Sequence, residues 1–151
     1  MKIKHIVTAL VIAVLVTGCG NKTTSISSAV GGNLSTQVGV RDAKGDIQAT
    51  GKSGYLVFGP YMALAPGKYS LVAKGLLSGP VSQVGTIDVA IKTGTQVLVS
   101  KPLQVNLGST AGKLATLEFK LDVPATDVEF RILIQDQVTG SFTGYELTTL
   151  E

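Results

Sequence analysis

Apolar and polar residues alternate in short segments from about Val38 onward, and glycine or proline separates these segments about every ten residues. In the segments 117–122 and 128–135, every second residue is apolar. A period of two indicates a strand that buries one of its faces. No segment after Cys19 shows a sustained apolar period of 3.6 residues, so we expect an all-β domain without a long helix.

The turn residues divide the chain into about eight or nine short strands. We expect hairpins around residues 42–46 and around Gly94, and strand boundaries at the pairs 59–60, 66–67 and 79–80. A series of short strands with this spacing predicts an antiparallel β-sandwich. We expect a jelly-roll-like arrangement, with an immunoglobulin-like one as the alternative.

The first 18 residues have the pattern of a signal peptide. Lys2 and Lys4 precede the almost unbroken apolar run Ile6–Val16. This run has the roughly 7–15-residue length of the apolar part of a signal peptide and is shorter than the ~20 residues that span a bilayer. Two small residues and then Cys19, the only cysteine, follow.

The four residues Val16-Thr17-Gly18-Cys19 resemble the lipobox of bacterial lipoproteins, which is an aliphatic residue and two small ones before a cysteine. The resemblance implies cleavage before Cys19, a diacylglyceryl thioether on its sulfur, and an acyl chain such as palmitate on the new amino group. We therefore expect a signal helix over 1–18 and attachment to a membrane through Cys19. The first residue after Cys19 is Gly20 and not the Asp of the retention signal. This resembles the sorting pattern of outer-membrane lipoproteins of the cell envelope. The alternative is an ordinary secretory signal with an unrelated cysteine.

Residues 19–37 are rich in Ser, Thr, Gly and Asn and poor in apolar residues. This composition predicts a flexible tether with a root-mean-square reach of about 25 Å. The alternative is a disordered stretch with a short strand at its end. The β-sandwich domain is then expected over 38–151.

Removal of residues 1–18 restricts the chemistry that the chain can perform. His5, the only histidine, leaves with the signal, and the lipid consumes the thiol of Cys19. Without His or a free Cys, Ser-His-Asp and Cys-His catalysis are excluded, and so are zinc sites with His or Cys ligands. A glycosidase with paired carboxylates is the enzyme class that remains. We expect a protein that is not an enzyme, with no catalytic residue and no cofactor.

Positive charge is sparse in the expected mature chain. Loss of Lys2 and Lys4 lowers the formal net charge of +3 to about +1. The remaining lysines are scattered singly, whereas nucleic-acid binding needs clustered Lys and Arg. We therefore expect no nucleic-acid partner.

The stretch Gly54–Tyr69, which reads GYLVFGPYMALAPGKY, is the densest local pattern in the chain. It resembles a Gly-Pro-Tyr…Leu-x-Pro-Gly-x-Tyr signature of β-sandwich accessory domains that are similar to carbohydrate-binding, galactose-binding-like modules. The tripeptides 87–89 (Ile-Asp-Val) and 129–131 (Glu-Phe-Arg) fit the same pattern. The resemblance covers about Gly51–Leu150 and implies a glycan-binding β-sandwich.

A sugar site needs an aromatic ring for C–H stacking and polar groups held in fixed positions. Arg131 lies in mid-strand among apolar residues and should pair with Asp88 or Glu129; the alternative is a cross-strand ion pair on a solvated face. For Tyr61 and Tyr69, the alternative is a packed ring with a hydrogen-bonded hydroxyl. The candidate ligand-binding residues are Tyr55, Tyr61, Asp88, Glu129, Arg131, Asp136 and Tyr145.

Three functions follow from these patterns. The first is a lipid-anchored envelope protein whose non-catalytic β-sandwich binds envelope polysaccharide. The second is an assembly protein whose sheet face binds an envelope protein, and the third is a carboxylate-dependent, glycan-active enzyme. We predict no metal site but leave a structural calcium ion open, because Asp42 and Asp46 bracket a turn without forming an Asp-x-Asp-x-Asp run.

Overall fold

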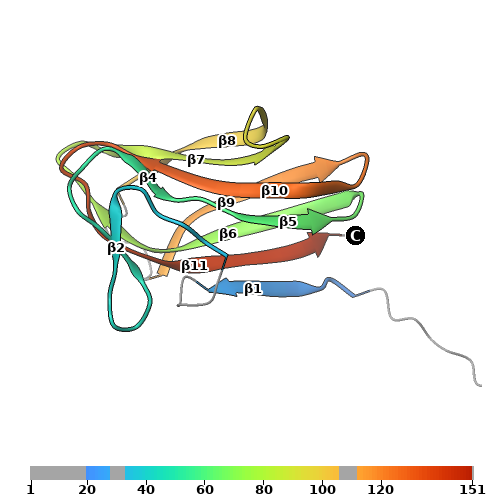
Figure 1. The fold of residues 1–151 in the computed structure, drawn as a ribbon, viewed down its shortest axis with the longest axis horizontal. Helices are drawn as coiled ribbons and strands as arrows, with labels where there is room; N and C mark the ends of the chain where they lie inside the picture. The colour runs from blue at the N-terminus through green and yellow to red at the C-terminus, as the bar shows by residue number, and fades with distance from the viewer. Residues whose placement is uncertain (1–19, 28–32, 106–111, 151) are drawn as a thin grey trace, which may run out of the picture.

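The computed structural model describes residues 20–27, 33–105 and 112–150. Within these ranges the chain forms eleven strands and no helix. The strands are β1 (Thr23–Ser27), β2 (Gly39–Arg41), β3 (Ile47–Ala49), β4 (Gly54–Val57), β5 (Pro60–Leu64), β6 (Gly67–Ser78), β7 (Gln83–Ile91), β8 (Gln96–Gln104), β9 (Gly112–Leu121), β10 (Ala125–Ile134) and β11 (Thr139–Leu150). They form two antiparallel sheets that pack face to face as a β-sandwich (Figure 1), which confirms the predicted fold class.

The order of the strands is that of a jelly roll. The first sheet has the order β2-β3-β11-β6-β9, with β1 beside β11 as well, and the second has the order β4-β10-β7-β8, with β5 also beside β10. Strands β4 and β5 pair with opposite halves of the same edge of β10, so they act as one interrupted strand. From β5 onward, every connection except the β7–β8 hairpin passes from one sheet to the other. Two antiparallel sheets connected in this way have the architecture of a jelly roll, and β1 and β2 extend the first sheet here.

Strand alternation builds the core between the two sheets. On β10, Val128, Phe130, Ile132 and Ile134 all point inward, and none has more than 2% of its surface exposed. Phe130 contacts the ring of Tyr145 from the opposite sheet in an edge-on arrangement, with 5.4 Å between the ring centroids. The period-two patterns of 117–122 and 128–135 are therefore confirmed as strands with one buried face. The other face of β10 carries the residues of the candidate site.

The predicted hairpin at residues 42–46 is present between β2 and β3. Asp42 Oδ1 accepts hydrogen bonds from the backbone N–H groups of Lys44 (2.8 Å) and Asp46 (3.0 Å). Desolvation acts to raise the pKa of Asp42, but these bonds and one from Gln48 lower it below its ordinary value. Gly45 adopts a φ of +90°, which a residue with a side chain would avoid.

The structure differs from the expected tether at both of its described parts. Thr23–Ser27 forms β1, which pairs with β11 in a continuous five-residue register. Leu34 is 4% exposed in the core, and Ser35 exchanges two backbone hydrogen bonds with Phe58. Strand pairing satisfies backbone N–H and C=O groups whatever the side chains are, so a polar sequence can complete a sheet edge. Composition alone does not reveal such a strand.

The expected signal peptide and Cys19 lie outside the described residues. In the part of the chain that the structure describes, no helix has the length and apolar character needed to cross a bilayer.

Candidate functional site

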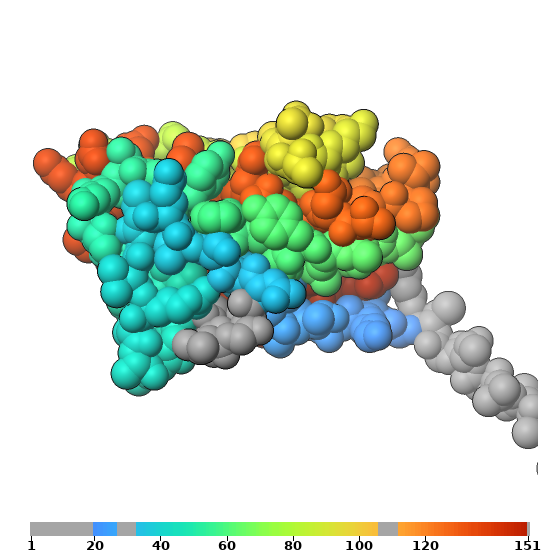
Figure 2. All heavy atoms as spheres, viewed as in Figure 1, coloured from blue at the N-terminus to red at the C-terminus, as the bar shows by residue number. Residues whose placement is uncertain are grey.

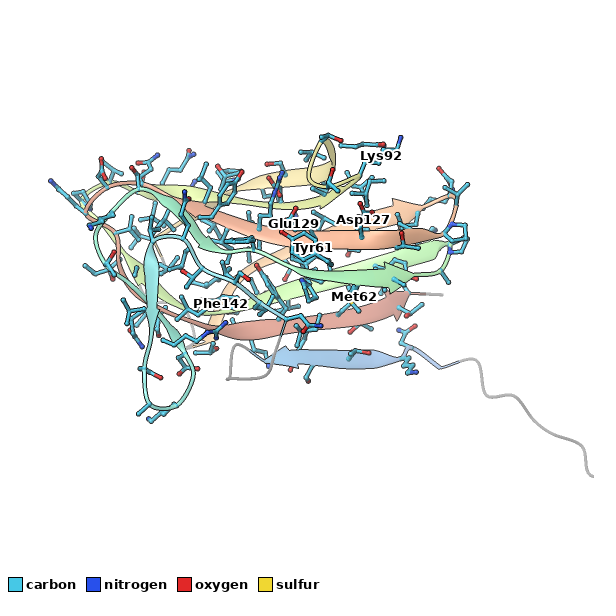
Figure 3. The ribbon with its side chains drawn as sticks, in the orientation of Figure 1. Tyr61, Met62, Lys92, Asp127, Glu129 and Phe142 are labelled. Carbon is cyan, nitrogen blue, oxygen red and sulfur yellow. The ribbon has the colours of Figure 1, made fainter. Side chains whose placement is uncertain are left out.

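A cavity of about 340 Å³ opens on the outer face of the second sheet, between β4, β5, β10 and the turn that joins β7 to β8. Figure 2 shows this turn, in yellow, standing beside β5 in green and β10 in orange. In Figure 3, Tyr61 and Glu129 lie next to each other beneath the turn that carries Lys92. The lining residues are Gln37, Tyr55, Phe58, Tyr61, Thr93, Glu129 and Arg131.

Strand β10 supplies the charged residues of the cavity. Phe130 and Ile132 occupy the core side of this strand, so Glu129 and Arg131 project from its outer side. Glu129 is nevertheless only 5% exposed, and it is the one buried charged residue among those that the structure describes. Residues that are distant in sequence cover it.

Tyr61 covers Glu129 from one side. Its Oη donates a hydrogen bond to Oε1 of Glu129 over 3.0 Å. The backbone of Tyr61 has a φ of +59°, and the register between β5 and β10 shifts between the pairs at Val128 and Glu129. A non-glycine residue in this conformation stores about 1–3 kcal/mol of strain, which is common at ligand sites. Burial, together with the bond to Glu129, raises the pKa of Tyr61, so its hydroxyl stays protonated as a donor.

Arg131 is held by Asp88 on the neighbouring strand. Arg131 Nε donates to Asp88 Oδ1 over 2.7 Å and Nη2 donates to Oδ2 over 3.0 Å. The two residues are directly opposite in the register of β10 and β7, and their side chains are 12% and 18% exposed. Hydrogen bonding to Asp88 raises the pKa of Arg131. The expected cross-strand pair is present with Asp88 as the partner, but it is largely buried rather than solvated.

The guanidinium of Arg131 has two further contacts. Its Nη1 donates to the backbone carbonyl of Gly94 over 3.2 Å, and its Cζ lies 5.7 Å from the centre of the Tyr55 ring. The second contact is within the range of a cation–π interaction. Arg131 thus organises the wall of the cavity, with most of its hydrogen-bonding capacity already used.

Glu129 retains an unsatisfied oxygen. Among the described residues, its Oε2 has no hydrogen-bond donor, and the nearest cation is Arg131 Nη1 at 3.9 Å. Arg131 donates two hydrogen bonds to Asp88 and none to Glu129, so its ion pair with Glu129 is the longer one. Buried carboxylates are ordinarily paired and hydrogen-bonded; here Tyr61 donates to Oε1 and Arg131 Nη1 stays 3.9 Å from Oε2, so Oε2 can still accept a hydrogen bond from a ligand.

The β7–β8 turn closes the cavity from above. Lys92, Thr93 and Gly94 have successive φ values of +56°, +55° and +80°. The N–H of Thr93 donates to Asp127 Oδ2 over 2.7 Å, which fixes the turn against the start of β10. A Cβ on Gly94 would lie 2.8 Å from Arg131 Nη1 and 3.1 Å from Glu129 Oε2. Only glycine allows the turn to approach these two side chains so closely.

The structure brings together five of the seven candidate residues. Four of them, Tyr55, Tyr61, Glu129 and Arg131, line the cavity, and Asp88 holds Arg131. The other two are elsewhere. Asp136 follows β10 and accepts a hydrogen bond from the N–H of Ser53 (2.9 Å). Tyr145 belongs to β11 of the other sheet.

Tyr145 is a core residue, and its assignment as a ligand-binding candidate is wrong. It is 2% exposed and packs against Phe142, with 4.7 Å between the ring centroids. A register shift between Phe142 and Gly144 in the pairing of β11 with β6 places both rings on the inner face, although they are three residues apart. Burial raises the pKa of Tyr145 well above its ordinary value. Its hydroxyl has no hydrogen-bond partner among the described residues.

Tyr69 is a packed ring with a hydrogen-bonded hydroxyl, which confirms the alternative to a sugar-binding role. Its ring stacks on Phe119 with 5.2 Å between the centroids, and its Oη donates to the carbonyl of Ala65 over 2.7 Å.

Sequence reasoning missed Gln37, Phe58 and Thr93, which also line the cavity. Gln37 belongs to the expected tether, Phe58 follows β4, and Thr93 lies in a turn. The one local signal was the position of Phe58 directly before Gly59-Pro60, where a strand must break. No three His, Cys, Asp or Glu side chains of the described ranges are close enough to hold a metal ion together.

Comparison with known proteins identifies the fold but no family. No family model and no curated protein matches the sequence. Among solved structures, the chain is similar to the C-terminal CBM6 of LamC, a marine laminarinase from Zobellia galactanivorans, with a TM-score of 0.55 and 10% identity over 84% of this chain and 99% of that one. It is also similar to the CBM36-1 domain of a multidomain xylanase from the hindgut metagenome of Trinervitermes trinervoides (TM-score 0.41, 11% identity, 83% and 96% covered). A third match is the subviral particle of infectious bursal disease virus VP2 (TM-score 0.42, 16% identity), where 87% of this chain matches 33% of that one.

Proposed function

We propose that this protein is a non-catalytic glycan-binding β-sandwich, attached to the bacterial cell envelope through lipid on Cys19. The observation that carries the proposal is the cavity in which Tyr55, Phe58 and Tyr61 surround a nearly buried Glu129 with a free oxygen. Aromatic faces beside a few fixed polar groups are the usual composition of a small-ligand site.

The chemistry of a sugar fits both halves of this cavity. A pyranose ring has an apolar face of C–H groups, which packs on an aromatic ring, and an edge of hydroxyl groups. Tyr61 is 48% exposed, so its ring is available for stacking. Glu129 Oε2 can accept a hydroxyl hydrogen at the edge of the sugar. The fold supports the proposal too, because the CBM6 domain of the laminarinase is a carbohydrate-binding module with the same β-sandwich architecture.

Calorimetric titration of the full-length protein, purified in detergent, tests glycan binding. The ligands are tetrasaccharides of β-1,3-linked glucose, β-1,4-linked glucose and β-1,4-linked xylose. We expect at least one to bind with a Kd below about 1 mM and Tyr61→Ala to weaken that binding. Val81→Ala is the control, since Val81 is 51% exposed in the β6–β7 connection, away from the cavity. Failure of every glycan to bind at millimolar concentration would contradict the proposal.

The proposed lipid anchor fixes which end of the sandwich is near the membrane. The N–H of Thr149 donates to the carbonyl of Lys22 over 2.9 Å, so the chain joins the sheet from Lys22 onward. Cys19 is four residues before Thr23, a path of at most about 14 Å. The lipid would thus hold the domain close to the bilayer, instead of at the end of a flexible tether. Gly20 favours the outer membrane within this proposal. Mass spectrometry tests it, because an intact Met1 or an unmodified Cys19 would contradict the anchor.

A further inference from the structure

The cavity has an excess of negative charge at its base. Arg131 is the one cationic residue among the described lining residues, and its Nε and Nη2 both donate hydrogen bonds to Asp88. Glu129 remains, with Oε2 at 3.9 Å from Arg131 and without a hydrogen-bond donor.

Among the ion pairs described, Glu129 has Arg131 alone as its partner. Lys92 is exposed in the same turn, and Figure 3 shows its side chain extending away from Tyr61 and Glu129. A ligand with its own carboxylate or phosphate would therefore find no available positive partner. It would also be repelled by Glu129 at short range, where a partly buried charge is poorly screened.

We infer that the cavity selects glycans that carry a protonated amine, such as polymers of glucosamine, over neutral and acidic glycans. This inference rests on the proposed function and names its ligand class. An ammonium group has three N–H donors, and one of them can reach Glu129 Oε2 in a charge-assisted hydrogen bond, which is about twice as strong as a neutral one. The same group would bring a second, closer cation to a buried carboxylate whose own ionic partner, Arg131, is 3.9 Å away.

The aromatic walls favour the same ligand. The face of an aromatic ring attracts a cation within about 6 Å of its centre. One ring of the cavity already has this role, because Tyr55 lies 5.7 Å from the guanidinium of Arg131. Phe58 and Tyr61 also line the cavity, and their rings can hold a second cation beside Glu129. Aromatic faces and a carboxylate together are a recognised means of binding an ammonium group.

Titration of the full-length protein with three β-1,4-linked tetrasaccharides of one backbone tests the inference. They are the glucosamine tetramer, its N-acetylated form and the glucose tetramer, at pH 6 and low salt. We expect the glucosamine tetramer to bind at least about tenfold more tightly than the glucose tetramer, and this advantage to shrink as salt is added. In Glu129→Gln the ratio of the two affinities should fall to about one. Glu118→Gln is the matched control, because Glu118 is exposed on β9 of the other sheet and should leave the ratio unchanged.

The outcomes separate the inference from the proposed function. If the neutral or N-acetylated tetramer binds as tightly as the glucosamine tetramer, amine selection is wrong and glycan binding stands. If none of these three tetramers binds but the β-1,3-linked glucose or the xylose tetramer does, amine selection is wrong and glycan binding stands; if no glycan of either series binds, both are wrong. An unchanged ratio in folded Glu129→Gln would overturn the role of Glu129. The comparison on the unaltered protein needs no variant, so it decides the ligand class even if Glu129→Gln does not fold.

Discussion

Tyr61 and Glu129 are 68 positions apart in the sequence, yet Tyr61 Oη donates to Glu129 Oε1 over 3.0 Å on the outer face of the second sheet. This bond joins β5 to β10 and leaves Oε2 facing the cavity without a donor. It also explains how a carboxylate that is 5% exposed remains on the outer side of a strand. The candidate site is thus a product of strand pairing between distant segments.

The ring and the hydroxyl of Tyr61 can be tested separately. Tyr61→Phe keeps the stacking ring but removes the donor, so we expect glycan affinity to stay within a few-fold and the free energy of unfolding to fall by about 1 kcal/mol. Tyr61→Ala also removes the ring and should weaken affinity at least about tenfold, equivalent to about 1.4 kcal/mol. Calorimetric titration and chemical denaturation measure the two effects. Equal affinity losses in both variants would show that the ring has no role in binding.

Gly94 provides a test of the cavity that has a close control. Gly94→Ala places a Cβ at 2.8 Å from Arg131 Nη1, so these side chains must shift and glycan binding should be lost. The control is Gly51→Ala, because Gly51 has almost the same φ, +79° against +80° for Gly94, but a Cβ at this position would meet no atom within 4 Å. Both variants should lose about 1–2 kcal/mol of stability from the left-handed backbone, and only Gly94→Ala should lose binding. Loss of binding in both, measured by titration of folded protein, would contradict the assigned cavity.

Two buried tyrosines should respond oppositely to loss of their hydroxyls. Tyr145 Oη has no partner among the described residues, so Tyr145→Phe should stabilise the protein by up to about 1 kcal/mol. Tyr69 Oη donates to Ala65 over 2.7 Å, so Tyr69→Phe should destabilise it by about 1 kcal/mol. Urea denaturation measures both. Destabilisation of similar size in the two variants would mean that Tyr145 has a partner in solution.

Tyr145→Phe should also change how stability depends on pH in alkaline solution. Burial raises the pKa of Tyr145 well above its ordinary value of 10.0 in the folded protein. Its protonated form therefore contributes stability that is fully present below pH 10 and is lost as the pH rises through the folded pKa. We expect the decrease of stability above pH 10 to be less steep in Tyr145→Phe than in the unaltered protein. Parallel curves in denaturation titrations would contradict a raised pKa.

The orientation at the membrane can be measured with two exposed valines. Val123 belongs to the connection between β9 and β10 and Val81 to the connection between β6 and β7. The β9–β10 connection is at the end of the sandwich where β1 begins, and the β6–β7 connection is at the opposite end (Figure 1). They are 67% and 51% exposed. In lipidated protein the thiol of Cys19 is consumed, so a fluorophore on Val123→Cys or Val81→Cys reports one position. We expect a quencher on lipid headgroups to affect the label at 123 much more strongly; equal quenching would contradict the short attachment.

Part of the candidate site could be predicted from single strands. Alternation on β10 places Glu129 and Arg131 together on one face, opposite Phe130. A guanidinium in mid-strand also requires a carboxylate neighbour, and Asp88 provides it. The burial of Glu129 could not be predicted in this way, because it depends on the approach of Tyr61 and Gly94 from other strands.

The sequence by itself determined the strands, the sandwich and the inner and outer faces, because apolar residues at every second position need a covering layer and the chain after Cys19 shows no helical period that could supply one. Only the tertiary structure decided where a register shift between paired strands interrupts the alternation of inner and outer residues. A register shift turns Tyr145 into the core, and another at β5 accompanies the left-handed Tyr61 beside Glu129. The largely polar strand β1 likewise forms on the open edge of β11, where Ile26 is its one apolar contact with the core. Both register shifts and the pairing of β1 depend on backbone hydrogen bonds between distant segments, which the amino-acid composition does not reveal.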